Sequence, residues 1–404
     1  MMRRREFLLP LGAVLPAIQR LAASPQLKVT SLELFVVKVS FRGNWVFVRL
    51  KTDKGITGLG EASHGLVGFG KAGARDDEVM GAELKEFFAL VRGEPPFAIE
   101  KFRRRGWSRA KAGGRKAATA FSALEQALWD LCGKALGAPV YELLGGKVRD
   151  ELKMYGNLNR ATNEDRSPGG FAANARKVVA DGFRAVKAAP FDGMARLSAP
   201  RAEVAKGIES AIRSIEAMRQ AIGPEIDLLI DVHSHLDRAL AIEVARRLEP
   251  QNLYWYEEPV RPENLDDTLA IARAIKQPLA AGEVLFGVEG FAPLVRNRAA
   301  AVIMPDVKHC GGILEGRHIA AMARAEGGIA VSPHNPSGPV ATAASVQLCA
   351  GMSNLSILEH AWGEVPWRAE LITPPEEIRN GTIRVPERPG LGIELNERAV
   401  RRHS

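Results

Sequence analysis

The feature that most constrains the fold is a regular alternation of short apolar stretches and amphipathic helices between Lys153 and Glu359. Typical helical stretches lie at 203–221, 238–248 and 265–275. The pattern predicts eight strands, which end at Gly156, Lys187, His233, Glu257, Glu283, Asp306, His334 and Glu359. Eight such periods in this length match the size of a (β/α)8 barrel. A doubly wound open sheet is the alternative α/β fold, because it shows the same alternation.

The segment before this barrel reads differently. Alternating strands are predicted within 32–61, with a hairpin turn at Asp53-Lys54-Gly55. Helices are predicted at 80–91 and 120–135, the second ending before Gly137 and Pro139. We therefore expect an α+β domain at 26–148, the barrel at 149–370, and a Pro-rich C-terminal tail at 371–404 that packs back on the first domain.

The first 25 residues have the profile of an export signal. A basic start precedes an apolar stretch and the small residues Ala22-Ala23-Ser24, and Arg4-Arg5-Glu6-Phe7-Leu8 resembles the twin-arginine motif. This predicts a periplasmic protein exported in folded form. The alternative is a cytoplasmic protein with an N-terminal extension. The rest of the sequence has no stretch that approaches a membrane span.

Charge and cysteine content exclude several classes of function. The net charge of +8 is spread along the chain, without a Lys/Arg run interleaved with aromatics, so nucleic-acid binding is not expected. An anionic small-molecule substrate is compatible with this charge. The three cysteines, Cys132, Cys310 and Cys349, are far apart and odd in number, which indicates buried thiols rather than disulfides or a zinc site.

Three acidic residues stand at the ends of consecutive predicted strands. Glu257 lies 26 residues after Asp231, and Glu283 lies 26 residues after Glu257. Since the carboxyl ends of barrel strands open at one mouth, the three side chains should converge there. Each alone reads as a solvent-facing or capping acid, but three crowded carboxylates repel unless a cation lies between them. Oxygen ligation with open positions favours Mg²⁺.

The later strands add titratable groups at the same mouth. Asp306 beside His334 would fix the imidazole tautomer and make His334 a general base. His233 would also face the mouth if its strand stays extended past Asp231, whereas His235 should lie in a surface loop. Lys187 would either reach solvent or bind an anion at the mouth.

Together these motifs make the chain resemble the mandelate racemase branch of the enolase superfamily, and most closely its acid-sugar dehydratases of the galactonate type. The resemblance covers nearly the whole chain from about Leu27 onward. Its motifs are ALWDLCGKALG at 127–137, LLGGKVRD at 143–150, YEEP at 256–259, AGE at 281–283, MPD at 304–306 with Gly311-Gly312, PH at 333–334 and LE at 358–359.

The resemblance implies a (β/α)7β TIM-like barrel with an N-terminal α+β capping domain completed by the C-terminal tail. It assigns Asp231, Glu257 and Glu283 to Mg²⁺ and Asp306 with His334 to the catalytic dyad. It places Glu359 at the acid that hydrogen-bonds the substrate carboxylate, and it matches His233 to the dehydratases' second histidine. It also implies capping loops near 41–45 and 64–68 that touch substrate, and a homo-oligomer, either a dimer or an octamer.

One departure from the branch's pattern bears on the reaction. Many members carry KxK on the second strand, where the second lysine is a base, but this chain has Lys187-Ala188-Ala189. Dehydration is therefore favoured over racemisation. We expect His334 to remove the C2 proton, His233 to protonate the departing C3 hydroxyl, and Lys187 with Glu359, in its acid form, to hold the substrate carboxylate. The two histidines could exchange roles. An epimerase of a 2-hydroxy carboxylate and a non-catalytic sugar-acid-binding barrel are the alternatives.

Overall fold

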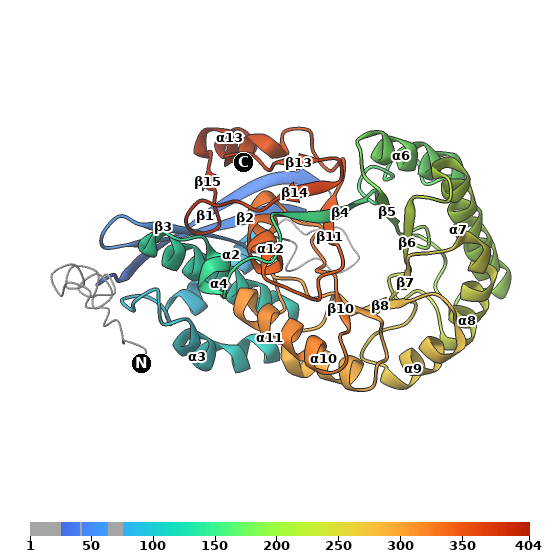
Figure 1. Ribbon diagram of the computed structural model, residues 1–404, viewed down its shortest axis with the longest axis horizontal. Helices are drawn as coiled ribbons and strands as arrows, with labels where there is room; N and C mark the ends of the chain where they lie inside the picture. Colours follow the sequence, from blue (N-terminus) through green and yellow to red (C-terminus); the bar gives the residue numbers. More distant parts are fainter. Residues whose placement is uncertain (1–25, 41–42, 64–75) are drawn as a thin grey trace, which may run out of the picture.

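A ring of parallel strands surrounded by helices forms the larger part of the computed structural model, which describes residues 26–40, 43–63 and 76–404 (Figure 1). The strands pair in chain order from β4 to β10, and β11 returns to pair with β4. A bridge between Val331 of β10 and Leu355, just before β11, completes the ring. The predicted barrel is thus confirmed, and the open sheet is not adopted.

The bounds of the barrel elements show how closely chain order follows the expected alternation. The strands are β4 (Glu151–Asn157), β5 (Ala185–Ala188), β6 (Asp227–Asp231), β7 (Trp255–Glu257), β8 (Leu279–Ala281), β9 (Val302–Ile303), β10 (Ala330–Val331) and β11 (Leu358–Ala361). The helices are α6 (Pro168–Ala180), α7 (Arg201–Ile222), α8 (Arg238–Arg247), α9 (Leu265–Ala274), α10 (Gly287–Arg296), α11 (Gly312–Ala325) and α12 (Pro339–Ala350). The short 3-10 helix η2 (Glu249–Gln251) follows α8.

The last strand lacks a partner helix. β11 is followed by the short 3-10 helix η3 (Arg368–Leu371) instead of an α-helix, so the barrel is of the (β/α)7β type. Side chains alternate along each strand between two apolar layers. Leu229 and Trp255 point into the barrel with a small interior cluster, whereas Leu228 and Ile230 pack outward against the helices. This alternation explains why the strands read as continuous apolar runs.

Several strands end before the positions expected from the sequence. β6 ends at Asp231, and β8, β9 and β10 end two or three residues before Glu283, Asp306 and His334. The physical reason is that the chain turns at the mouth of the barrel. Gly282, for example, has φ +110°, a conformation that glycine adopts readily. These three side chains therefore project from loops rather than from strands.

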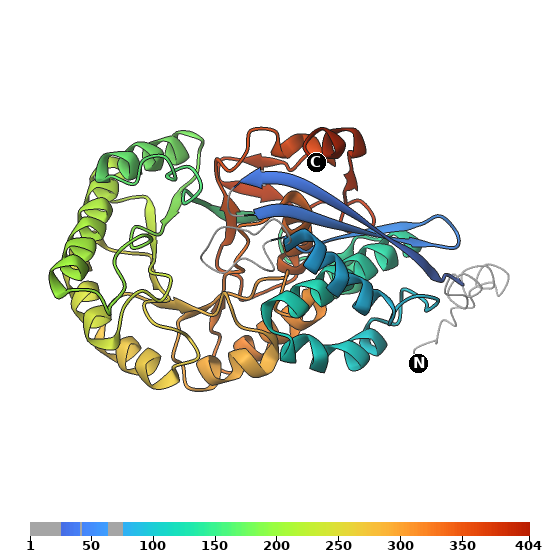
Figure 2. The ribbon, with the colours of Figure 1, turned by 180° about the vertical axis from the view of Figure 1, so that it is seen from behind.

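The first domain is a three-stranded antiparallel sheet covered by helices (Figure 2). Its elements are β1 (Val29–Ser40), β2 (Gly43–Thr52), β3 (Thr57–Glu61), α2 (Asp76–Phe88), α3 (Ile99–Ala112), α4 (Gly114–Leu136) and α5 (Val140–Leu143). The predicted hairpin joins β2 and β3. α3 was not predicted, because its basic sequence hides an apolar face formed by Ile99, Phe102, Trp107 and Ala110.

The C-terminal tail packs on the first domain, as expected. Its elements are β12 (Ile372–Thr373), β13 (Ile378–Arg379), β14 (Thr382–Arg384), β15 (Glu394–Leu395) and α13 (Glu397–Arg402). Arg49 of β2 forms an ion pair of 2.7 Å with Glu397, and the Lys38 amide donates to the His403 carbonyl over 2.8 Å. The tail also reaches the barrel, since β14 pairs with β4.

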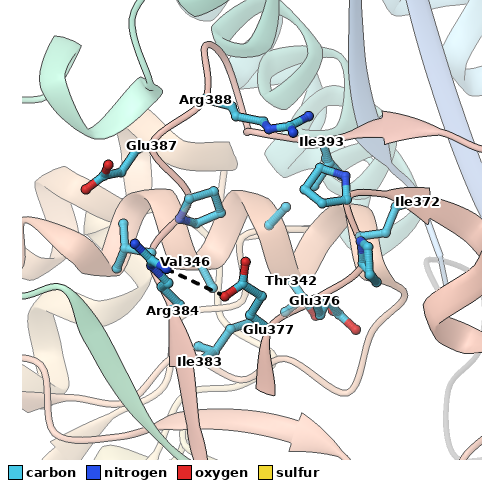
Figure 3. A pocket seen from close by; sticks show the side chains of 15 residues that line it. Thr342, Val346, Ile372, Glu376, Glu377, Ile383, Arg384, Glu387, Arg388 and Ile393 are labelled. Carbon is cyan, nitrogen blue, oxygen red and sulfur yellow. Dashed lines mark ion pairs between the residues drawn. The ribbon is translucent and has the colours of Figure 1, made fainter. Parts of the chain in front are cut away.

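An apolar pocket lies between α12 and the tail (Figure 3). Val346, Ile372, Ile383 and Ile393 contribute to its walls, and charged side chains such as Arg388 stand at its rim. The residues that the sequence nominated for catalysis do not line it.

Cys132, Cys310 and Cys349 are buried free thiols, as predicted. Within the described ranges, no helix has the length and apolarity needed to cross a membrane.

Two buried glutamates of the first domain hold the ends of barrel helices. Glu61, at the end of β3, accepts hydrogen bonds from the backbone N–H groups of Gly338 (2.7 Å) and Ala341 (2.8 Å) at the start of α12. Glu125 of α4 accepts from Ile313 (2.7 Å) at the start of α11. Carboxylates are favourable at helix N-termini. Since α11 and α12 follow the loops that carry Asp306 and His334, these contacts fix the first domain against the barrel mouth.

Candidate active site

The three predicted metal ligands lie near one another at the barrel mouth. Asp231 and Glu257 are paired neighbours at the ends of β6 and β7, and Glu283 follows β8, which pairs with β7. All three are buried, with 1%, 0% and 5% of their surfaces exposed. Their orientations differ, however. Glu257 is held by Lys187 and by the Trp255 indole N–H (2.8 Å), whereas Asp231 and Glu283 face a common space with His233.

Lys187 is buried between the acidic residues, and the expectation that it reaches solvent is wrong. Its Nζ lies 2.5 Å from Glu257 Oε1, 3.0 Å from Asp231 Oδ2 and 3.9 Å from Glu359 Oε1. Burial alone would lower the pKa of Lys187, but Asp231 and Glu257 raise it well above its usual range. Burial and the charge of Asp231 raise the pKa of Glu257. The raised pKa of Glu257 shows that its ionised form is unfavourable beside Asp231, even with Lys187 between the two groups.

The residues present fit a divalent cation. Asp231 Oδ2 and Glu283 Oε2 are buried carboxylate oxygens without a hydrogen bond of good geometry among the described residues. One ligand atom each from Asp231, His233 and Glu283 lies within 4.8 Å of the others. Each oxygen has an ion-pair neighbour, Lys187 and His233 for Asp231 and His334 for Glu283, but a buried carboxylate without a well-aligned hydrogen bond is costly, and a bound cation would compensate this cost. The oxygen-rich donor set is of the kind that hard cations prefer.

Asp306 and His334 form the expected pair. His334 Nδ1 lies 2.7 Å from Asp306 Oδ2, and its Nε2 lies 3.2 Å from Glu283 Oε2. Burial would raise the pKa of Asp306, but Lys308 (3.2 Å) and the neighbouring imidazoles hold it well below its usual range. If the ionised Asp306 accepts a hydrogen bond from Nδ1–H, the unprotonated nitrogen of His334 is Nε2, which faces the carboxylate cluster.

Glu359 lies beside Lys187 and is held by two donors. Its Oε1 accepts a hydrogen bond from the Asn157 amide (2.5 Å), and its Oε2 accepts one from the Asn335 backbone N–H (2.7 Å). Burial would raise the pKa of Glu359, but Lys187 and His334 lower it. The structure therefore favours the carboxylate form of Glu359. The expectation that Glu359 hydrogen-bonds the substrate carboxylate stays a prediction.

His233 reaches the mouth by a route that differs from the expected one. The strand does not stay extended, because His233 has φ 49° and Ser234 has φ 56°. His233 nevertheless places Nε2 3.1 Å from Asp231 Oδ2, while its Nδ1 lies 2.6 Å from Asp192 Oδ1. Burial would lower the pKa of His233, but Asp231 and Asp192 raise it well above its usual range. His235 is partly exposed, as expected of a loop residue, and lies 3.6 Å from Asp192.

Asp192 is a site residue that the sequence did not reveal. It lies in the loop after β5, four residues beyond the end of that strand. The only signal was its place in PFDG at 190–193, which reads as a turn.

Of the expected substrate loops, 41–42 and 64–68 lie outside the described residues. Trp45 is fully buried and packs edge-on against Trp367, which lies just before η3, so it is a core residue.

Two family models match the chain. One, described as enolase C-terminal domain-like, covers residues 170–399, and the other, the mandelate racemase/muconate lactonizing enzyme N-terminal domain, covers 33–145. A D-galactonate dehydratase from Variovorax paradoxus is 33% identical, over 93% of this chain and 94% of the relative. A D-xylonate dehydratase from Haloferax volcanii is 32% identical, over 89% of this chain and 85% of the relative.

Solved structures show the same likeness. A member of the enolase superfamily from Salmonella Typhimurium superposes with a TM-score of 0.83 at 28% identity, covering 94% of this chain and 98% of that one. Similarity therefore extends over both domains. The two curated relatives are named for sugar acids of different length, so likeness to them does not select one sugar.

Proposed function

The chain belongs to the mandelate racemase/muconate lactonizing enzyme family of the enolase superfamily, and from this premise we propose that it is a Mg²⁺-dependent acid-sugar dehydratase. The substrate is an aldonate, and the product is the corresponding 2-keto-3-deoxy acid. The dehydratase names of its relatives support this reaction class. The missing second lysine, replaced by buried Ala189, also supports it, because racemisation needs a base on each face of the α-carbon.

One observation carries the proposal: an imidazole stands at each side of the carboxylate cluster. His334 Nε2 lies 3.2 Å from Glu283, and His233 Nε2 lies 3.1 Å from Asp231. Elimination of water needs two such groups, one to take a proton and one to give a proton. Both histidines face a carboxylate at each ring nitrogen. Although burial would lower the pKa of His233, Asp231 and Asp192 raise it well above its usual range, which suits an imidazolium that donates. His334 is therefore assigned as the base.

Each residue of the site has its own role in the proposed reaction. Asp231, Glu257 and Glu283 would hold Mg²⁺, whose charge stabilises the enediolate that forms when the C2 proton leaves. His334 Nε2 takes the C2 proton while Asp306 holds the opposite nitrogen. His233 Nε2 protonates the C3 hydroxyl, which departs as water, and the enol then becomes the keto acid. Lys187 and Glu359, 3.9 Å apart, are assigned to the end of the site that receives the substrate carboxylate.

The test is a substrate screen. Protein lacking residues 1–25 is incubated with Mg²⁺ and a library of aldonic and aldaric acids, and semicarbazide reports 2-keto-3-deoxy products. We expect a product with an aldonate that is lost in EDTA and in His334→Asn. Full turnover by a folded His334→Asn protein would show that His334 is not the base. Absence of products across the library from Mg²⁺-bound protein would refute aldonate dehydration.

Epimerisation of a 2-hydroxy carboxylate is the second candidate, because imidazoles on two sides of one α-carbon also serve that reaction. An otherwise intact acid that carries deuterium at C2 and has the inverted configuration at C2 would identify it. Export through the twin-arginine pathway remains a prediction, since residues 1–25 lie outside the described ranges. Assembly into a dimer or octamer also remains a prediction.

A further inference from the structure

The site contains a second aspartate–histidine pair. Asp192 Oδ1 lies 2.6 Å from His233 Nδ1, which is close to the 2.7 Å between Asp306 Oδ2 and His334 Nδ1. In each pair the other ring nitrogen faces a carboxylate of the central cluster. His233 Nε2 faces Asp231 over 3.1 Å, and His334 Nε2 faces Glu283 over 3.2 Å. In both pairs Nδ1 therefore contacts an aspartate outside the cluster and Nε2 faces the cluster, although His233 follows β6 and His334 follows β10.

The local backbone makes the second pair dependent on Asp192. His233 leaves the strand direction because it and Ser234 have positive φ, a conformation that non-glycine residues rarely adopt. The Ser234 backbone N–H donates to the Glu258 carbonyl over 2.7 Å, and the His233 N–H donates to Asp231 Oδ1 over 3.0 Å. These contacts fix the backbone, whereas the orientation of the ring depends on the contacts of its two nitrogens, Nδ1 with Asp192 and Nε2 with Asp231. A carboxylate at Nδ1 fixes the ring.

The loop that carries Asp192 is itself anchored. The Arg166 guanidinium donates to the Ala189 carbonyl over 2.6 Å, and the Ala189 N–H donates to the Asn159 side chain over 2.7 Å. The side chain of Asp192 is only 15% exposed, and that of His233 is 9% exposed. A contact between two such sheltered groups is less screened by water than a surface pair.

We propose that Asp192 is a positioning residue that orients His233 as the acid of the dehydration. Resting on the proposed function, this assigns the second half of the reaction to a pair rather than to a lone histidine. Asp192 receives the Nδ1–H, which directs the Nε2–H toward the leaving group. The C3–O bond breaks, its electron pair stays on oxygen, and that oxygen takes the Nε2 proton and leaves as water. Asp192 takes up no proton itself.

The first test measures the ring without any substrate. Protein with ¹⁵N-labelled histidines is compared by NMR as wild type, Asp192→Asn and His233→Asn, the last identifying the His233 signals. We expect Asp192→Asn to shift the ring-nitrogen signals of His233 and to leave those of His334 unchanged. Unchanged His233 signals would overturn the proposal, whatever reaction the enzyme catalyses.

The second test separates the two half-reactions in D₂O, using D-galactonate, D-xylonate and any aldonate that the screen identifies. A positioned acid contributes about 10²- to 10⁴-fold, so Asp192→Asn should lose roughly 100-fold or more in water loss. It should still exchange the C2 proton for deuterium through His334. Asp192→Glu should recover part of the rate. With a C3-fluoro analogue, Asp192→Asn should react nearly as fast as wild type, because fluoride leaves without needing a proton from His233.

The matched control is Asp165→Asn. Asp165 is an exposed aspartate whose Oδ1 accepts the Ser167 N–H over 2.9 Å, before α6, and its replacement should leave turnover unchanged. If Asp192→Asn slows exchange and water loss equally, or slows the fluoro analogue as much as the natural acid, Asp192 is only structural. If wild type turns over no aldonate, the proposed function fails, and the NMR comparison still decides whether Asp192 orients His233.

Discussion

Replacing Lys187 by methionine tests whether the buried cluster is built for a cation. Lys187 is the ammonium group between Asp231 and Glu257, and all three side chains are at most 1% exposed. Methionine keeps most of the volume and removes the charge. Removing one partner of a buried ion pair costs about 3 to 5 kcal/mol, because the remaining charge stays desolvated. We expect this loss in metal-free Lys187→Met protein at neutral pH.

The expected loss translates into a measurable change in melting temperature. An unfolding entropy of roughly 2 cal/mol/K per residue gives about 0.8 kcal/mol/K for the 404-residue chain. The metal-free variant should therefore melt about 4 to 6 °C below metal-free wild type. Saturating Mg²⁺ should restore most of this difference, since a divalent cation between the same carboxylates replaces the lost positive charge and stabilises the folded state by binding it.

Lys134→Met provides the control. Lys134 Nζ lies 3.0 Å from Asp130 and 2.6 Å from Glu394, away from the barrel mouth, and its side chain is 13% exposed. This variant should also lose stability, but by the same amount with and without Mg²⁺. Differential scanning calorimetry of both variants in EDTA and in Mg²⁺ gives the comparison. A Lys187→Met deficit that Mg²⁺ leaves unchanged would refute the idea that the carboxylates hold a divalent cation.

Three further changes have defined outcomes. Asp306→Asn should reduce C2-proton exchange by roughly 100- to 10,000-fold, measured by NMR in D₂O, because His334 loses its oriented tautomer; an unchanged rate would contradict the dyad. Glu61→Gln should lower the free energy of unfolding by about 2 kcal/mol in urea titrations, because glutamine keeps only one of the two oxygens that accept backbone N–H groups of α12; no change would show that one acceptor is sufficient. Burial and Arg368 lower the pKa of His360 to about 4, so the unfolded chain binds that proton more readily, and stability falls as the pH drops from about 6.5 toward 4. His360→Phe should remove about 1 to 2 kcal/mol of the loss between pH 7 and pH 5; parallel pH profiles for the two proteins would refute this.

Sequence reasoning placed the main-chain positions of the site well, because strand order in a barrel follows chain order. Asp231 and Glu257 could be assigned to adjacent strand ends from spacing alone, and they are paired neighbours in β6 and β7. Asp306 beside His334 followed from the same rule. Periodicity also located most helices. α3 was missed, since Gly106 and many basic residues interrupt its apolar pattern.

The sequence did not predict where side chains point once the chain has passed the last paired residue of a strand. Lys187 could reach solvent or turn inward, and only the charges of two neighbouring strands decide that it is buried. The positive φ of His233 and the position of Asp192 depend on loops, where no periodicity applies. The protonation of Glu359 depends on donors from Asn157 and Asn335, which lie far from it in the chain.

The most direct test of the whole account is the position of deuterium after turnover in D₂O. The aldonate identified by the screen is incubated with the Mg²⁺-loaded enzyme, and the products are examined by NMR. Proton removal by His334 followed by loss of the C3 hydroxyl predicts a 2-keto-3-deoxy acid with one deuterium at C3. Recovery of an intact 2-hydroxy acid with deuterium at C2 and no keto acid would contradict dehydration, and inverted configuration at C2 would identify an epimerase.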